Sequence, residues 1–183
     1  MDLLRESPQG LQVAPVNPKE DVAVLLYTGG TTGVSKGVML SHFNLTSNVA
    51  QIREWLQLGD EHHTSLAVLP MFHSYGFTAA VGLGLASGFT LILVPRFDAG
   101  DLLKTIAKYR PTVFPGVPTM YIGLLNHPDI NKYDLKSIQL CVTGAAAMPV
   151  DLLRRFEQVT GATILEGNGL TETSPVTHAN PRE

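Results

Sequence analysis

The chain contains one cysteine and little charge of either sign. Cys141 is the single cysteine among 183 residues, so no internal disulfide can form, and this composition is typical of proteins in a reducing compartment. Because Cys141 lies inside the apolar run IQLCV, we expect a buried structural thiol. Charged residues make up 16% of the chain and the net charge is −3, with no cluster of Lys and Arg. These values argue against a surface that binds nucleic acid.

The sequence also lacks a long uninterrupted apolar run. Its most apolar stretch, residues 76–95, is broken by glycines and ends at Pro95, whereas a membrane-spanning helix needs about 20 consecutive apolar residues. The N-terminus has no basic start followed by an apolar stretch, so we expect no signal peptide. We therefore predict a cytoplasmic protein without a transmembrane segment. Peripheral contact with a membrane and the oligomeric state stay open.

Apolar residues make up 44% of the chain, and short apolar runs alternate with helix-like segments. The sequence predicts about six strands, near residues 22–28, 64–70, 89–95, 111–116, 137–143 and 162–167. It predicts helices over residues 42–59 (capped by Ser41), 76–87, 101–110 (capped by Asp98 or Asp101), 118–127 and 150–161 (ended by Gly161). Apolar strands joined by helices indicate an α/β fold with a largely parallel sheet covered by helices on both faces.

Unusual residues gather in the loops that follow the expected strands, at 28–37, 70–76, 144–148 and 167–175. In parallel sheets, ligands bind beyond the carboxyl ends of the strands. We therefore expect these four loops to form one binding site. Residues 1–21 are expected to be a lead-in linker, and the chain is expected to be a piece of something longer.

The loop YTGGTTGVSKG (27–37) has the composition of a phosphate-binding turn, because glycines let backbone N–H groups converge on an anion while hydroxyls and Lys36 add donors. It does not fit the P-loop spacing, which needs Gly-Lys followed by Ser or Thr, and no G-x-G-x-x-G is present. GVSKG does match the G-x-S-x-G nucleophile elbow, although that motif needs strand, turn and helix in immediate succession. A serine hydrolase using Ser35 with His73 or His178 stays open as an alternative.

Four segments resemble the motifs of the adenylate-forming superfamily, which includes acyl-CoA synthetases. They occur in the family's order and are YTGGTTGVSKGVMLSHFNL (27–45), PMFHSYGF (70–77), VTGAAAMP (142–149) and EGNGLTETSP (166–175). The resemblance covers nearly the whole chain and is most like long-chain fatty-acid–CoA ligases. It implies that residues 22–183 are part of the large N-terminal AMP-binding domain and that the C-terminal domain of the enzyme is absent.

The resemblance assigns roles to particular residues. Lys36, Thr171, Glu172 and His73 are the expected catalytic residues, with His73 acting in the carboxylate pocket by position rather than as a base. Thr28 and Glu172 are expected to hold Mg²⁺, a role that suits hard oxygen ligands. The residues expected to bind the nucleotide are Thr28, Gly29, Gly30, Thr31, Thr32, Gly33, Ser35, Lys36, Gly144, Ala145, Ala146, Asn168, Gly169 and Thr171.

Two other sites carry weaker expectations. Asn168 stands where family members usually carry an aromatic residue that would stack on adenine, a contact worth roughly 1 kcal/mol. His62 and His63 lie in the polar stretch GDEHHTS without further ligands at metal-binding spacing, so we expect them on the surface.

The implied reaction uses ATP, Mg²⁺ and coenzyme A to convert a carboxylic acid, expected to be a medium- or long-chain fatty acid, into an acyl-CoA. Aryl acids stay open. Because the resemblance places the lysine that supports adenylation and the ribose-binding Asp outside this chain, we expect weak nucleotide binding and no turnover from the chain alone. A non-catalytic nucleotide-binding module is the second alternative.

Overall fold

The structure is a computed structural model that describes residues 14–28, 33–59 and 61–182. Its strands are β1 (Val22–Thr28), β2 (Lys36–Ser41), β3 (Thr64–Ala67), β4 (Thr90–Leu93), β5 (Val113–Gly116), β6 (Leu140–Thr143), β7 (Thr163–Gly169) and β8 (Val176–Ala179). Its helices are α1 (His42–Trp55), η2 (Gly76–Gly82), α2 (Leu83–Ala86), α3 (Ala99–Tyr109), α4 (Pro118–Leu125), η3 (Ile130–Lys132), α5 (Val150–Thr160) and η4 (Thr171–Thr173).

Six strands form the main sheet in the order β4-β3-β5-β6-β7-β8. All neighbouring strands in it run parallel except β7 and β8, which are antiparallel. The predicted α/β fold with a largely parallel sheet is therefore confirmed. The strand β8 was not predicted, because its four residues VTHA carry no apolar run that would mark a strand.

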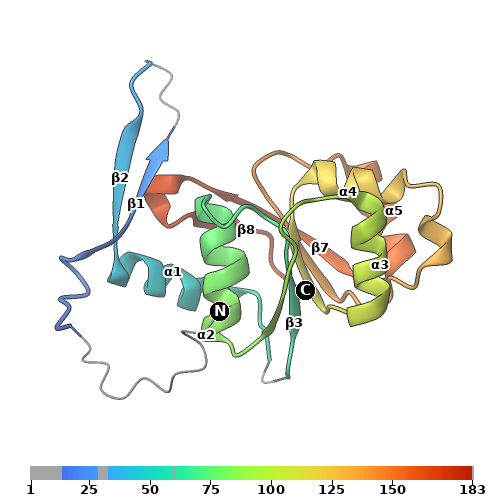
Figure 1. Cartoon of the computed structure of the whole chain (residues 1–183), viewed down its shortest axis with the longest axis horizontal. Helices are drawn as coiled ribbons and strands as arrows, with labels where there is room; N and C mark the ends of the chain where they lie inside the picture. Colours follow the sequence, from blue (N-terminus) through green and yellow to red (C-terminus); the bar gives the residue numbers. More distant parts are fainter. Residues whose placement is uncertain (1–13, 29–32, 60, 183) are drawn as a thin grey trace, which may run out of the picture.

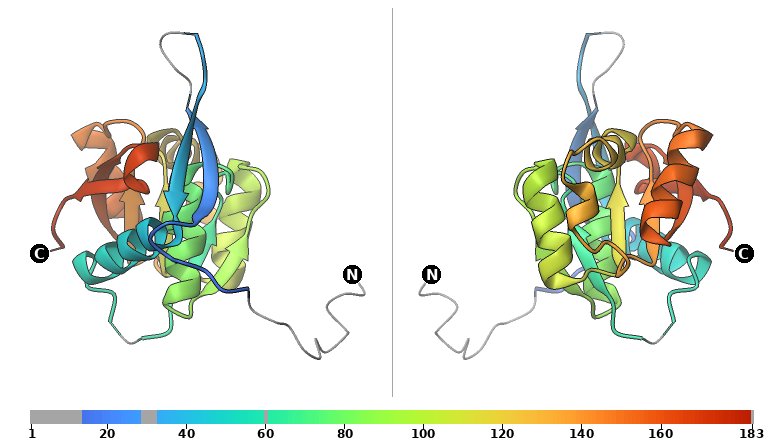
Figure 2. Two further views of the ribbon diagram at one scale, coloured as in Figure 1. Left: turned by 90° about the vertical axis from the view of Figure 1, so that its left-hand side faces the viewer. Right: turned by 90° about the vertical axis from the view of Figure 1, so that its right-hand side faces the viewer.

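The first predicted strand does not belong to this sheet, and here the sequence interpretation was wrong. Strand β1 pairs antiparallel with β2 in a separate hairpin, in which Leu25 lies opposite Met39 and Thr28 opposite Lys36. The reason is that the apolar residues after the glycine loop, Val38, Met39 and Leu40, form a second strand beside the first. Figure 2 shows the hairpin projecting from the body of the molecule.

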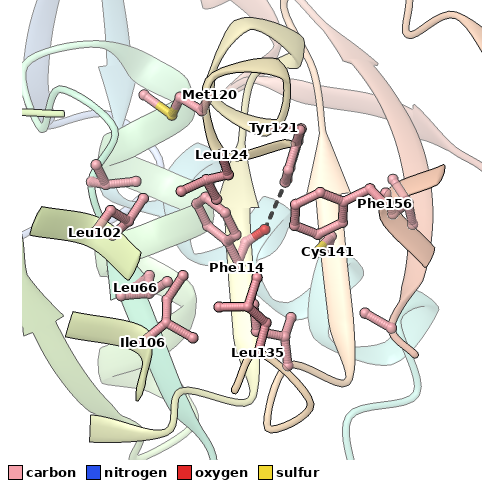
Figure 3. Close-up of a cluster of buried hydrophobic side chains, with 14 of the residues drawn as sticks. Leu66, Leu102, Ile106, Phe114, Met120, Tyr121, Leu124, Leu135, Cys141 and Phe156 are labelled. Atoms are coloured by element: carbon pink, nitrogen blue, oxygen red, sulfur yellow. Dashed lines mark hydrogen bonds between the residues drawn. The ribbon is translucent and has the colours of Figure 1, made fainter. Parts of the chain in front are cut away.

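Helices cover both faces of the main sheet (Figure 1). Helices α3, α4 and α5 pack on one face around a core that includes Phe114, Tyr121 and Phe156. Figure 3 shows these rings beside Leu102, Ile106 and Leu124, with the Tyr121 hydroxyl bonded to the Phe114 carbonyl. On the other face, α1 and α2 enclose a smaller apolar cluster with side chains of β6 and β7.

Most helix boundaries follow the local signals in the sequence. Ser41 caps α1, since its hydroxyl accepts a hydrogen bond of 3.2 Å from the Asn44 N–H. Asp98, and not Asp101, caps α3. Gly161 ends α5 with a left-handed φ of +77°, as predicted. The helix α1 ends at Trp55, earlier than expected, because Gln57 adopts a positive φ of 47°.

Two further expectations need correction. The segment expected as one helix over 76–87 begins as the π-helix η2 before it continues as α2. His62 is exposed as expected, but His63 is buried, because its ring packs edge-on against Phe89 and its Nδ1 lies 3.0 Å from the Thr112 hydroxyl. Within residues 14–28, 33–59 and 61–182, no helix is long and apolar enough to span a membrane.

Candidate functional site

A cavity of about 960 Å³ lies beside the carboxyl ends of the main-sheet strands, between them and α1, η2 and β8. Its lining combines residues from all four motif segments, which are spread over more than 140 positions of the chain. The predicted site residues that line it are Thr28, Lys36, His73, Gly144, Ala145, Gly169, Thr171 and Glu172. The structure therefore brings these eight residues to one cavity, and their roles in binding stay predictions.

The hairpin supplies the basic group of the cavity. Thr28 and Lys36 are opposite one another at the end of the β1–β2 ladder, and the Thr28 hydroxyl lies 3.5 Å from the Lys36 carbonyl oxygen. This pairing holds the backbone of Thr28 beside that of Lys36, so the Thr28 hydroxyl and the Lys36 ammonium group extend from neighbouring positions. Gly33 and Ser35 are exposed and do not line the cavity, and Gly29 to Thr32 lie outside the described residues.

The strand β2 directly follows Ser35, and the first helix begins only at His42. A nucleophile elbow requires a helix immediately after the serine, so Ser35 does not have that geometry. The serine hydrolase alternative is not supported.

The acidic residue of the cavity, Glu172, lies on the short helix η4 between β7 and β8, where η4 contacts β2. The side chain of Thr173 stabilises this turn, since its hydroxyl accepts from the Leu170 N–H at 3.1 Å and lies 2.9 Å from the Leu170 carbonyl. Gly169 is needed at the approach to the turn, because a Cβ there would lie 2.2 Å from the Pro175 carbonyl oxygen. The turn therefore brings Thr171 and Glu172 to the hairpin.

The oxygen atoms available near Lys36 fit a magnesium ion that is shared with phosphates. Thr28 and Glu172 line the same cavity, and Glu172 forms no hydrogen bond or ion pair with another described residue. The described part of the chain contains no group of three or more His, Cys, Asp or Glu side chains that could hold a metal by itself. Mg²⁺ is commonly bound by one or two carboxylates together with substrate phosphates, and this donor set is of that kind.

His73 is exposed at the turn that follows β3. The backbone N–H of His73 donates to the Pro70 carbonyl at 3.1 Å, and the ring Nδ1 accepts from the backbone N–H of Tyr75 at 3.2 Å. Because Nδ1 is an acceptor, the neutral ring carries its proton on Nε2. No carboxylate of the described residues bonds to this ring, and the role of His73 stays a prediction.

The segment after β6 is held by a residue that sequence reasoning missed. The Glu166 carboxylate accepts a hydrogen bond of 2.8 Å from the Met148 N–H, and this closes the loop that contains Gly144 and Ala145. Ala145 has a positive φ of 66°, a conformation that an L-residue keeps only when its surroundings enforce it. The sequence signal for Glu166 was its position as the first charged residue after the apolar run ATIL.

Besides Gly33 and Ser35, two further predicted nucleotide ligands lie away from the cavity lining. Ala146 is exposed in the loop that Glu166 closes. Asn168 is exposed on β7, where its backbone carbonyl oxygen accepts from the Thr177 hydroxyl at 3.1 Å. Their contacts with a nucleotide stay predictions.

Beyond the polar end, the cavity wall becomes apolar. It continues between the sheet and α1, where it is lined by Ile52, Leu56, Ala79, Leu83 and Val142. Tyr75 also lines it, and burial raises the pKa of the Tyr75 hydroxyl, so this group stays neutral and donates to the Val142 carbonyl at 2.7 Å. The cavity can therefore receive a ligand with an anionic head and an apolar body.

Comparison with known proteins agrees with this arrangement. The model of a family described as "AMP-binding enzyme" matches residues 3–183. A long-chain-fatty-acid–CoA ligase of Bacillus subtilis is 48% identical over 177 residues, which are 96% of this chain and 32% of that protein. The anthranilate CoA ligase AuaEII in complex with anthranoyl-AMP superposes with a TM-score of 0.88 at 29% identity, over 98% of this chain and 35% of that one.

The ATP-bound MatB of Rhodopseudomonas palustris superposes with a TM-score of 0.76 at 35% identity, over 88% of this chain and 31% of that one. The chain thus spans about a third of the length of the proteins that it matches.

Proposed function

Since the chain belongs to the AMP-binding enzyme family, we propose that it forms the ATP-binding part of a longer enzyme that activates a carboxylic acid and transfers the acyl group to coenzyme A. The observation that carries the proposal is the convergence of Thr28, Lys36, Thr171 and Glu172 on one cavity with an apolar continuation. The polar end would take the triphosphate of ATP, and the apolar end would take the acyl group.

In the first step, a carboxylate oxygen of the acid attacks the α-phosphorus of ATP. The bond from that phosphorus to the bridging oxygen breaks, and pyrophosphate leaves. Lys36 would neutralise charge on the departing pyrophosphate, and Thr171 would orient the α-phosphate. Mg²⁺, when bound, supplies further charge neutralisation on the phosphates, and Thr28 and Glu172 would hold it.

In the second step, the sulfur of coenzyme A attacks the acyl carbonyl carbon, the bond from that carbon to the phosphate oxygen breaks, and AMP leaves while the thiol proton goes to solvent. Neither step needs a protein nucleophile, and Ser35 does not have the geometry of a nucleophile elbow. His73 would position the carboxylate, with the Tyr75 N–H fixing the orientation of its ring. The domain that completes the site for this step would lie in the part of the enzyme outside this chain.

We further propose a medium- or long-chain fatty acid as the substrate. The apolar wall formed by Ile52, Leu56 and Leu83 supports it, as does the name of the ligase from Bacillus subtilis. The superposed ligase with anthranoyl-AMP binds an aryl group, so aryl acids are the competing class for a test. A cytoplasmic location belongs to the same proposal, supported by the single, buried Cys141.

The test is a chimera in which this chain replaces the matching third of the Bacillus subtilis ligase. We expect it to form acyl-CoA from medium- and long-chain fatty acids in preference to benzoate or anthranilate, with pyrophosphate released in equal amount. Lys36→Ala should lower the rate by about 10²- to 10³-fold, as for the loss of one group that stabilises developing charge. A chimera that binds ATP but forms no acyl-CoA from any acid would contradict the proposal.

A further inference from the structure

Two buried polar side chains reach from the helical layer to the backbone that follows Glu172. The Asn48 amide donates to the Val176 carbonyl at 2.8 Å and accepts from the Val176 N–H at 3.1 Å. The Thr78 hydroxyl donates to the Ser174 carbonyl at 2.8 Å. Asn48 and Thr78 are only 5% and 2% exposed, and Asn48 also lines the wall of the cavity, so the loss of either side chain leaves a buried backbone group without its partner.

Asn48 forms with Val176 the pair of bonds that a neighbouring strand would otherwise form. Its second amide hydrogen points to the Gln51 side chain, 3.3 Å away, so most of its hydrogen-bonding capacity is used. The strand β8 is four residues long, lies at the edge of the main sheet beside β7, and its register is irregular at Asn168 and Gly169. Residues 171–176 also form hydrogen bonds within their own turn and to Leu170, but among the described residues Asn48 and Thr78 are the side chains that link this segment to the helical layer.

The held backbone is adjacent to the acidic residue of the site. Residues 174–176 follow η4 directly, and Ser174 has a positive φ of 79°. Asn48 lies on α1, and the N-terminal end of this helix follows directly after β2, which carries Lys36. Helix α1 thus connects the basic group of the cavity to the acidic one, through Asn48.

We propose that Asn48 and Thr78 are positioning residues that fix Thr171 and Glu172 relative to Lys36, and so determine how much Mg²⁺ strengthens nucleotide binding. The proposal rests on the proposed function for the role of Glu172. Both side chains act through the backbone of residues 174–176, and Thr78 does so without lining the cavity, whereas Asn48 also lines it.

The first test measures amide hydrogen exchange in the 183-residue chain and does not depend on any ligand. Asn48→Ala should speed exchange of the amides in 171–176 by about 10- to 100-fold, because two buried hydrogen bonds are lost, while α3–α5 keep their protection. Val49→Ala is the matched control, since Val49 is the next residue of α1, is buried against Gly82 and does not line the cavity. Unchanged exchange of 171–176 in Asn48→Ala would overturn the inference.

The second test compares ATP affinity with and without Mg²⁺. In Asn48→Ala, the factor by which Mg²⁺ increases ATP affinity should fall about tenfold or more. The ATP affinity measured without Mg²⁺, which Lys36 provides, should stay the same. A gain from Mg²⁺ equal to that of the unmodified chain would overturn the inference, even with faster exchange. If the unmodified chain binds no ATP, the proposed function fails instead, and the exchange result still decides whether Asn48 holds the loop.

A gentler variant covers the case in which Asn48→Ala does not fold, and it also removes any direct effect on the cavity, because Thr78 does not line it. Thr78→Val is nearly isosteric and removes only the donor to Ser174. This variant should shift exchange of 171–176 and the gain from Mg²⁺ in the same direction as Asn48→Ala, and an absence of both shifts would overturn the inference.

Discussion

The hydroxyl of Tyr75 donates a hydrogen bond of 2.7 Å to the carbonyl oxygen of Val142. The Tyr121 hydroxyl lies 3.1 Å from the same oxygen and 3.0 Å from the carbonyl of Phe114. The two tyrosines come from different segments, the turn after β3 and the helix α4. Their convergence ties the turn that carries His73 to the end of β6, directly before Gly144.

This arrangement predicts that the two tyrosines act together. Tyr75→Phe should lower the free energy of unfolding by about 0.5–1.5 kcal/mol, since one buried hydrogen bond is lost. In Tyr75→Phe, the Tyr121 hydroxyl still bonds to the Val142 carbonyl, and in Tyr121→Phe the Tyr75 hydroxyl does. The double variant Tyr75→Phe/Tyr121→Phe should therefore lose more free energy of unfolding than the two single variants together. Urea unfolding of the three variants measures this, and strictly additive losses would show that the shared acceptor has no energetic meaning.

A second prediction compares two glycines. Gly169→Ala would place a methyl group 2.2 Å from the Pro175 carbonyl oxygen, so the backbone before Thr171 must shift and nucleotide affinity should fall. Gly161→Ala meets no atom within 4 Å, and its cost should be about 1 kcal/mol from the positive φ alone. Binding titrations and thermal melts separate the two effects. Equal ATP affinity in both variants would contradict the prediction.

The buried His63 predicts a particular pH dependence of stability. Burial lowers the pKa of His63 below its ordinary 6.5, so the folded chain binds this proton less readily than the unfolded chain. Stability should therefore be full above pH 6.5 and fall as the pH drops from 6.5 towards the lowered pKa, a range in which only the unfolded chain gains the proton. His63→Gln should flatten this part of the profile. A profile that stays steep in His63→Gln would contradict the assignment.

The elements that the sequence predicted well are those with local causes. Ser41 and Gly161 form their caps with atoms a few residues away, and the strands of the parallel sheet are marked by their own apolar runs. The hairpin was missed because its second strand is defined by pairing with the first across the glycine loop. The burial of His63 depends on Phe89 and Thr112, which directly precede the strands β4 and β5.

The same distinction holds at the site. The four motifs predicted which loops meet, because their chemistry is local to each loop. Asn48, Tyr75 and Thr78 carry no such signal, since each bonds to a backbone group between 67 and 128 positions away. Their partners exist only after the chain has folded.

Glu166, on β7, gives a further prediction with a control, Glu157, on the preceding helix α5. The Glu166 and Glu157 carboxylates each accept one backbone N–H, from Met148 at 2.8 Å and from Ile164 at 3.0 Å. Alanine at either position should lower the free energy of unfolding by about 1–2 kcal/mol. Only Glu166→Ala should also weaken ATP binding, because only its loop reaches the cavity. Glu166→Gln keeps the acceptor and should restore the affinity.

The most direct measurement is the melting temperature of the 183-residue chain with MgATP. At a concentration about 100 times Kd, a bound ligand stabilises the native state by about 2.7 kcal/mol, which for this length corresponds to a rise of about 5–10 °C. We predict such a rise for the unmodified chain and for Lys104→Ala, a change of an exposed lysine on α3, and none for Lys36→Ala. No rise in the unmodified chain at saturating MgATP, or an equal rise in Lys36→Ala, would contradict the account.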